Sequence, residues 1–220
     1  IFNREASKKQ AAKYGRRDPD YEFGVNPCSE IILRPNQFCN LTEVVVRATD
    51  TIESLSRKVR LAAILGTIQS NYTKFPYLRK VWQRNTEEER LLGLSLTGIM
   101  DNPLMTTANT ELEDTLEILR KLAVDTNTMW ADHLGIPAST AITCVKPSGT
   151  VSQLVDSSSG IHARHSNYYI RTVRGDNKDP LTQFMKDQGI PSEPDVMKPD
   201  ATTVFSFPMQ SPLGAVHTAD

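Results

Sequence analysis

The sequence lacks the features of a membrane-spanning, secreted or nucleic-acid-binding protein. No apolar run approaches the roughly 20 residues that a helix needs to cross a bilayer, and no signal peptide is recognisable at the amino end. The formal net charge is −1, from 25 basic and 26 acidic residues. The chain therefore has no general attraction for nucleic acid or an anionic membrane, and any phosphate has to be held locally. We expect a cytoplasmic protein.

Cysteine is also scarce. The three cysteines, Cys28, Cys39 and Cys144, are odd in number and have no repeated spacing, which excludes a disulfide scaffold and favours a reducing compartment. With 39% hydrophobic and 23% charged residues the composition is globular, and 220 residues can form one large domain or two small ones. Because the chain runs from Ile1 to Asp220 without an obvious cap at either end, we expect a piece of a longer protein.

The most informative stretch is Asn26-Pro27-Cys28-Ser29-Glu30, in which a thiol and a carboxylate stand two residues apart. If Pro27 sets a turn and the next three residues run extended, the side chains of Cys28 and Glu30 share one face. A free cysteine is more often a buried structural residue. The neighbours argue against that role here, since they would place a reactive sulfur and a proton acceptor in one pocket.

The segments after this stretch predict a second thiol nearby. Ile31–Leu33 is apolar enough for a buried strand, and the turn at Arg34–Gln37 leads into a returning strand at Phe38–Val46. Such a return would bring Cys39 near Cys28. A structural disulfide between them is the alternative, which a reducing compartment disfavours.

Periodicity and capping residues predict the other elements. The expected helices are residues 3–14, 51–69, 85–99, 112–134 and 181–187. The expected strands are residues 141–145, 168–174 and 202–207. Helices alternating with short apolar strands indicate an α/β protein whose helices cover a mostly buried sheet or barrel.

A second informative place follows the expected strand at residues 141–145. The stretch begins at Lys146, and the junction itself consists of Pro147, Ser148, Gly149, Thr150, Val151 and Ser152. Such a strand-to-helix junction exposes backbone N–H groups, and the dipole of the following helix favours an anion there. An ordinary turn is the alternative, because the junction lacks the lysine and the spacing of the Walker loop.

Two further groups of residues carry less information. The adjacent Arg16 and Arg17 could meet an anion, but a solvated charged turn is the expected structure. His162 and His165 stand three apart without a third ligand, so we expect no metal site.

Together, a carboxylate, two thiols and an anion-binding junction suit redox chemistry on a phosphorylated small molecule. The carboxylate can take a proton from a substrate hydroxyl, and two thiols supply two electrons when they close to a disulfide. Two alternatives remain open. One is a nucleotide-binding module with structural cysteines and no catalysis, and the other is a two-thiol redox protein that binds no nucleotide.

These residues resemble a known family. Asn26–Ile31, Phe38–Leu41 and Pro147–Thr150, in this order, are similar to the catalytic subunit of ribonucleotide reductase. The short spacing between the first two cysteines, and Ser166–Arg174, look most like the adenosylcobalamin-dependent class II enzymes. The resemblance implies part of a ten-stranded α/β barrel with a central finger loop. Residues 1–220 would then be a partial barrel domain without the amino-terminal half of the barrel and the carboxy-terminal region.

The resemblance also implies roles for single residues. Cys28 would be the thiyl radical that abstracts the 3′ hydrogen, Glu30 would take the 3′ hydroxyl proton, and Asn26 would hydrogen-bond the ribose hydroxyls. Cys39 would be one of two reducing thiols, and the junction at Pro147–Ser152 would bind the substrate phosphates.

The implied cofactor is adenosylcobalamin, and the implied partners are a ribonucleotide, a thioredoxin-like dithiol reductant and the remainder of the same polypeptide. The other reducing cysteine would lie upstream of this chain, so Cys144 receives no role. We expect the chain alone to be inactive.

Overall fold

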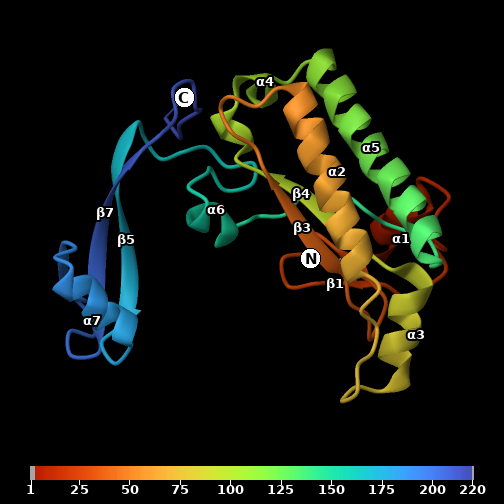
Figure 1. Ribbon diagram of the computed structural model, residues 1–220, viewed down its shortest axis with the longest axis horizontal. Helices are drawn as coiled ribbons and strands as arrows, with labels where there is room; N and C mark the ends of the chain where they lie inside the picture. Colours follow the sequence, from red (N-terminus) through yellow and green to blue (C-terminus); the bar gives the residue numbers. More distant parts are fainter. Residues whose placement is uncertain (1–2, 220) are drawn as a thin grey trace. The chain divides into compact units, whose positions relative to one another are not determined.

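The computed structural model describes residues 3–219 of the chain. It divides into two compact units, Ile1–Ala163 and Arg164–Asp220 (Figure 1). Among the described residues, no helix is long and apolar enough to cross a membrane.

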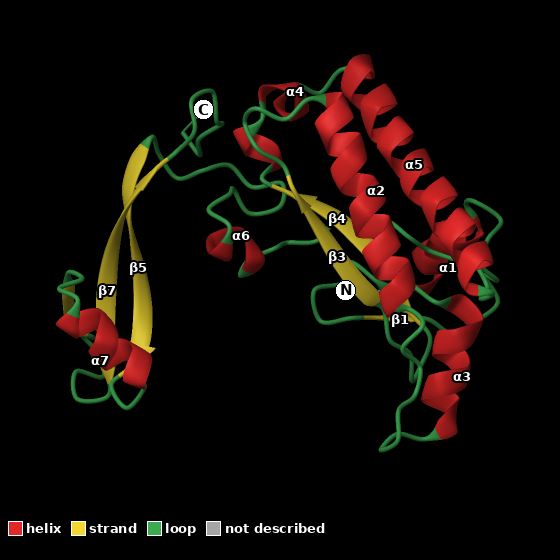
Figure 2. Cartoon of the chain, viewed as in Figure 1, coloured by secondary structure: helices red, strands yellow, loops and turns green. Residues whose placement is uncertain are grey.

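The first unit is built on a parallel sheet. Strand β3 (Asn40–Val45) pairs in parallel with β4 (Leu92–Thr97). A bridge between Leu94 and Thr143 adds a third parallel segment beside β4. Parallel neighbours need crossover connections, and helices α2 (Ile52–Gln69) and α5 (Thr110–Leu134) lie in them (Figure 2). The α/β class expected from the sequence is therefore confirmed.

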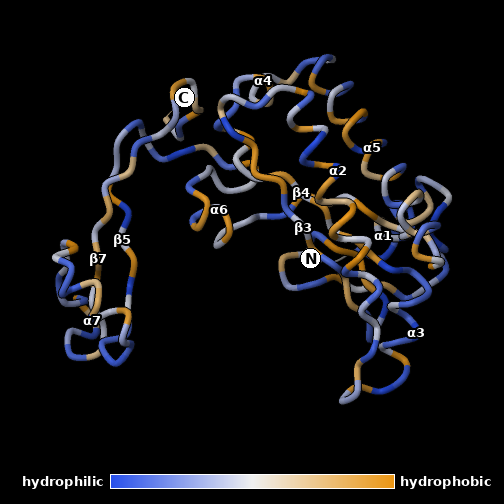
Figure 3. The backbone as a smooth tube through the Cα atoms, in the orientation of Figure 1, coloured by the Kyte–Doolittle hydropathy of each residue, from blue (hydrophilic) through white to orange (hydrophobic). Residues whose placement is uncertain are grey.

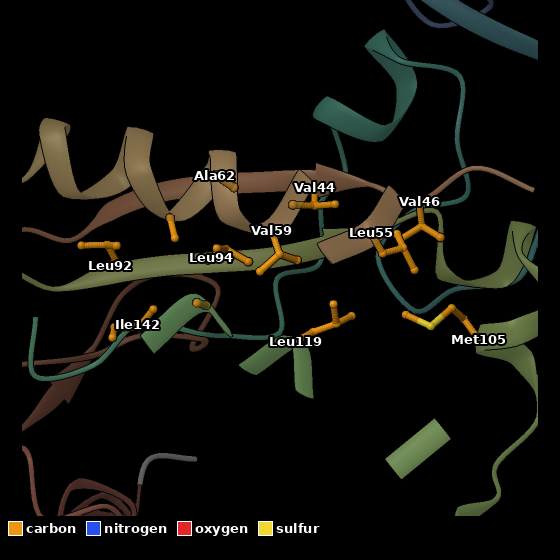
Figure 4. Packing of buried hydrophobic residues seen from close by; sticks show 12 residues of the cluster. Val44, Val46, Leu55, Val59, Ala62, Leu92, Leu94, Met105, Leu119 and Ile142 are labelled. Carbon is orange, nitrogen blue, oxygen red and sulfur yellow. The ribbon is translucent and has the colours of Figure 1, made fainter. Parts of the chain in front are cut away.

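One face of this sheet packs against the two long helices and forms the core. The buried apolar side chains come from β3, β4, α2, α5 and the bridge segment, and include Val44, Leu92, Leu94, Leu55, Val59, Leu119 and Ile142 (Figure 4). Apolar residues are interspersed with polar residues and glycine along β3 and β4 (Figure 3). Because side chains alternate along a strand, Leu41 and Glu43 of β3, and Gly93 and Ser95 of β4, point to the opposite face. That face carries the candidate site.

Helix caps explain where the well-predicted helices begin. Asn3 accepts hydrogen bonds from two backbone N–H groups at the start of α1 (Arg4–Ala12). Thr51 and Ser54 form a reciprocal capping box at the start of α2, and Asn109 caps α5. Gly135 ends α5 in the left-handed conformation. The shorter helical elements are α3 (Lys80–Glu89), a 3₁₀ turn at Ile99–Asp101, α4 (Pro103–Thr106) and α6 (Val151–Leu154).

The helix expected at residues 85–99 is wrong. Helix α3 ends at Glu89, Arg90 turns left-handed with a φ of 42°, and β4 follows at once. Leu91, Leu94 and Ile99 fit helical spacing, although Leu92, Leu94 and Leu96 also alternate with Gly93, Ser95 and Thr97 in the period-two pattern of a strand. The strand expected at Phe38–Val46 is confirmed as β3, but it pairs in parallel with β4. The strand expected at residues 141–145 is present only as the single bridge.

The second unit is an antiparallel sheet with one helix. Its strands β5 (Tyr168–Asp176), β6 (Ser192–Pro194) and β7 (Thr202–Gln210) have the order β5-β7-β6. Helix α7 (Pro180–Asp187) begins at the Asp179 cap. The two long strands and the helix were expected from the sequence, and β6 was missed because it is short and exposed without alternating apolar residues.

Candidate active site

A short hairpin carries the stretch that the sequence singles out. Strands β1 (Gly24–Val25) and β2 (Ile32–Leu33) pair antiparallel, and we call residues 24–33 the finger hairpin. The side-chain Oδ1 of Asn26 accepts a hydrogen bond from the backbone N–H of Ile31 at 3.0 Å, and its carbonyl oxygen accepts one from Ser29 at 2.9 Å. Asn26 therefore stabilises the loop through two hydrogen bonds, and Cys28 is exposed at the tip of the finger hairpin.

The extended backbone expected from Cys28 to Glu30 is wrong. Ser29 has a φ of 64°, so the chain reverses direction at the tip. Alternation along a strand consequently does not relate the two side chains. Cys28 is exposed, whereas the side chain of Glu30 is only 2% exposed.

A buried cluster of charges anchors the base of the finger hairpin. The Arg17 guanidinium donates two hydrogen bonds of 2.8 Å to the Glu89 carboxylate at the end of α3, and a third of 2.9 Å to the carbonyl of Ile32. Arg34 lies 3.2 Å from the same carboxylate, and Gln37 donates to it at 2.7 Å. The solvated turn expected at the arginine pair is therefore wrong for Arg17, whose side chain is 5% exposed.

Lys146 is the main cationic contact of Glu30. Its Oε1 accepts a hydrogen bond of 3.1 Å from Lys146 Nζ, while its buried Oε2 has no hydrogen-bond partner within residues 3–219. Burial opposes the charged form, but the backbone N–H of Glu30, the Asn26 side chain and Lys146 outweigh it and lower the pKa of Glu30. The surroundings of Glu30 therefore favour its charged form, and its Oε2 makes no hydrogen bond of standard length among residues 3–219.

Two more thiols lie within the electrostatic reach of Glu30. Cys39, just before β3, is half-buried, and burial and the charge of Glu30 raise its pKa. Burial, Glu30 and Cys39 raise the pKa of Cys144 to about 12. All three cysteines are free. Both half-buried sulfurs are consequently held as protonated thiols, while the approach of Cys39 to Cys28 stays a prediction.

Gly93 allows β3, the finger hairpin and the bridge segment to approach one another on the sheet. A Cβ at this position would lie 2.5 Å from the Leu41 side chain, 3.0 Å from Ile31 and 3.4 Å from the Cys144 sulfur. A larger residue would displace the side chains from β3, the finger hairpin and the bridge segment together. Because Gly93 has no side chain, the finger hairpin can lie against β4.

Ser159 and Gly160 hold the backbone at the Pro147–Ser152 turn. The Ser159 hydroxyl donates to the carbonyls of Pro147 at 2.9 Å and Ser148 at 3.1 Å. Gly160 packs so closely that a Cβ there would lie 2.7 Å from the Lys146 carbonyl. Within the described chain, no hydrogen bond uses the backbone N–H groups of residues 149–152, and the buried Ser148 hydroxyl has no partner. The turn therefore presents unused donors, although α6 behind it has only 4 residues.

The sequence alone assigned no site role to several polar residues of this face. Lys146 joins Glu30 to the turn, and its only sequence signal is a lysine directly before Pro-Ser-Gly-Thr. Glu43 and Ser95 are partners in the β3–β4 register, and their buried side-chain oxygens have no hydrogen-bond partner among residues 3–219. Alternation along a correctly assigned β4 would have found this pair.

The chain is similar to several curated proteins, although no protein-family model matches it. It is 30% identical to the adenosylcobalamin-dependent ribonucleoside-triphosphate reductase of Lactobacillus gasseri, over 96% of the chain and 32% of that protein. It is 29% identical to the protein of the same name from Euglena gracilis, over 92% of the chain and 28% of that protein. The chain thus spans about a third of the length of these relatives.

The fold shows the same similarity. A crystal structure of a B12-dependent, class II ribonucleotide reductase superposes with a TM-score of 0.71 at 28% sequence identity. The match covers 87% of this chain and 30% of the solved chain. The resemblance read from the sequence motifs is therefore confirmed: over nearly its whole length, the chain is related in sequence and fold to about a third of an adenosylcobalamin-dependent ribonucleotide reductase.

Proposed function

We propose that the chain is part of the catalytic barrel of a ribonucleotide reductase, which converts ribonucleotides to 2′-deoxyribonucleotides. The observation that carries the proposal is the finger hairpin, with an exposed thiol at its tip and a buried carboxylate two residues further along the chain. Because the chain spans about a third of its relatives, the activity belongs to the complete polypeptide, and this chain alone would be inactive.

The finger hairpin supplies the residues that would start the reaction. Cys28, as a thiyl radical, would abstract the 3′ hydrogen of the ribose, and its exposed position at the tip supports this role. The free Oε2 of Glu30 would accept the proton of the 3′ hydroxyl. Asn26 uses its Oδ1 to close the loop and its amide group acts on Glu30, so one amide N–H would remain to donate to the ribose hydroxyls.

The reduction requires two thiols. When the 2′ oxygen leaves as water, a thiol pair supplies two electrons and two protons and ends as a disulfide. Cys39 would be one of this pair, and its raised pKa keeps the proton that it must deliver. The second thiol would lie outside this chain. A dithiol reductant of the thioredoxin type would then restore both, in the reducing cytoplasm that three free cysteines favour.

The substrate phosphates would bind at the turn formed by Pro147, Ser148, Gly149, Thr150, Val151 and Ser152. The unused backbone N–H groups and the unpartnered Ser148 hydroxyl support this assignment. The carboxylate of Glu30 reaches the same turn through Lys146, so a nucleotide held by its phosphates at the turn would place its ribose toward the finger hairpin.

We place the binding site for adenosylcobalamin mainly outside this chain. Three of its cavities measure about 120, 150 and 400 Å³. Cavities of about 300–1,000 Å³ suit drug-sized ligands, and a corrinoid with its nucleotide tail is larger. The cofactor, whose bound form would supply the radical to Cys28, is expected to be held by the remaining part of the polypeptide.

Replacement of Cys28 by serine in the full-length enzyme tests the proposal. We expect loss of 2′-deoxynucleotide formation, measured by chromatography of the products, with unchanged nucleotide binding. Ser29→Gly is the matched control, because it alters the neighbouring side chain at the same loop tip and keeps the left-handed backbone possible. Deoxynucleotide formation by the Cys28→Ser enzyme would refute the radical role and favour the nucleotide-binding alternative.

A further inference from the structure

We propose that Lys146 is a positioning residue that couples phosphate binding at the Pro147–Ser152 turn to the release of Glu30 as a base. In the empty site Lys146 holds Glu30, and an arriving phosphate draws the lysine side chain away from it. This inference rests on the proposed function, since it assigns the carboxylate and the turn to the same substrate.

The geometry places Lys146 between the two parts of the site. Its Nζ lies 3.1 Å from Glu30 Oε1, although the two residues are 116 positions apart in sequence. The Lys146 side chain is 23% exposed and that of Glu30 is 2% exposed. Lys146 directly precedes the turn whose backbone N–H groups are unused. One cation can therefore serve either the carboxylate or an anion at the turn.

The backbone of Lys146 is fixed while its side chain is not. The close packing of Gly160 against the Lys146 carbonyl holds the main chain in place. The side chain has four flexible carbons and makes one hydrogen bond within the described residues, to Glu30. A swing of the ammonium group toward the turn requires only the loss of that one contact.

The charges around the pair favour this exchange. From the finger hairpin, Asn26 faces Glu30, and Cys28 acts on Lys146. From β3 and the bridge segment, the groups within reach are Cys39, Cys144 and, beyond Cys144, Glu43. Lys146 is the one cation among the groups that act on Glu30 in the described chain. A phosphate chain with two or more negative charges attracts this ammonium more strongly than a single carboxylate does.

Release changes the chemistry of Glu30 in the required direction. Lys146 is one of the groups that lower the pKa of this carboxylate, and a paired carboxylate is a weaker base. Once the ammonium has moved, only the Glu30 backbone N–H and the Asn26 side chain still oppose burial, so the proton affinity of Glu30 rises and its Oε1 loses the Lys146 hydrogen bond. Only a ligand with phosphates would create this stronger base, so a nucleoside without phosphates would not activate the site.

Replacing Lys146 by methionine in the full-length enzyme tests the coupling, because methionine keeps an unbranched stem and removes the charge. We expect the KM for the ribonucleotide to rise by about tenfold or more, as for the loss of a hydrogen bond to a charged group. We also expect the acidic limb of the kcat/KM profile to move to higher pH, because Glu30 loses its cation in the free enzyme. Lys146→Arg should restore part of both effects, and Lys8→Met on exposed α1 is the control for removing a lysine.

Two results would overturn the inference. An unchanged acidic limb in the Lys146→Met enzyme would show that the lysine does not control Glu30. A shifted limb with unchanged nucleotide affinity, measured by calorimetry, would show that it does not serve the phosphates. Thermal melts identify a folding defect, and Lys146→Gln then replaces the methionine variant. The Cys28→Ser experiment tests the proposed function separately, because it does not depend on pH or on phosphate affinity.

Discussion

Replacing Glu89 by glutamine tests whether the buried charge cluster holds the finger hairpin. The change keeps the shape of the side chain and removes its charge. Glu89 is 1% exposed, and it accepts hydrogen bonds from Arg17 at 2.8 Å on each oxygen and from Gln37 at 2.7 Å. A second guanidinium, Arg34, lies 3.2 Å away. The variant would leave two buried arginines without the anion that faces both.

Breaking a buried ion pair from one side costs about 3–5 kcal/mol, because the remaining charge stays desolvated. We expect a loss of about this size in the free energy of unfolding of the first unit. The matched control is Glu22→Gln, which removes the partner of Arg4 from a pair whose side chains are 69% and 67% exposed. Water screens that pair, so its loss should be much smaller.

Urea unfolding followed by tryptophan fluorescence provides the measurement. The 2 tryptophans, Trp82 and Trp130, both lie in the first unit, so the signal reports on that unit alone. Hydrogen exchange at the amide of Ile31, which bonds to Asn26, shows whether the hairpin loosens with it. A loss below about 1 kcal/mol, in the range of exposed pairs, would refute the role of the cluster as the anchor of the hairpin.

Three other predictions follow from burial, charge and backbone geometry. Iodoacetamide at pH 8 should label exposed Cys28 first and Cys144 last, as measured by mass spectrometry. The reason is that a pKa of about 12 leaves Cys144 almost no thiolate, and faster labelling of Cys144 would contradict this. Burial opposes the charge of Asp50, but hydrogen bonds from Lys58 and Ser54 outweigh it and lower the pKa of Asp50 in the folded state. The charged carboxylate therefore stabilises the fold fully above the unfolded pKa of about 3.9, and this contribution is lost as the pH falls through the folded pKa. Asp50→Asn should therefore lower the midpoint of thermal unfolding at pH 7 more than at pH 3, and an equal loss at both would count against it. Gly98→Ala should lower the free energy of unfolding of the first unit, measured in urea, by about 1–3 kcal/mol. A φ of +77° is strained for alanine, and the alanine Cβ would lie 2.4 Å from the Val46 carbonyl oxygen. An unchanged free energy of unfolding would contradict this geometry.

Local signals decided how much of the fold could be predicted. Helices α2 and α5 have capping residues and an apolar stripe, and both were found nearly to their ends. Strand β4 was assigned to a helix because a cap-like run at residues 85–89 precedes it, although its leucines alternate with Gly93, Ser95 and Thr97 as in a strand. The parallel pairing of β3 and β4 depends on residues about fifty positions apart, which no local pattern records.

The candidate site divides in the same way. Asn26, Cys28 and Glu30 stand in one short motif, so chemistry and spacing were enough to select them. The reversal at Ser29 was not predictable, because a left-handed serine is uncommon and carries no sequence mark. Lys146 was passed over as a site residue because its partner lies 116 residues away. The residues that act within one motif were thus found, and those that join separate segments were missed.

The anchoring of the finger hairpin has a consequence for biosynthesis. Arg17 and Glu89 are 72 residues apart in sequence, so the ribosome releases the whole hairpin well before its anchor exists. Contacts of such separation form late, because the intervening chain must first be ordered. During that interval Cys28 belongs to an untethered loop and is open to oxidation. Within this chain, Cys28 therefore leaves the ribosome before the residues that anchor its hairpin, and the hairpin is held only after α3 is complete.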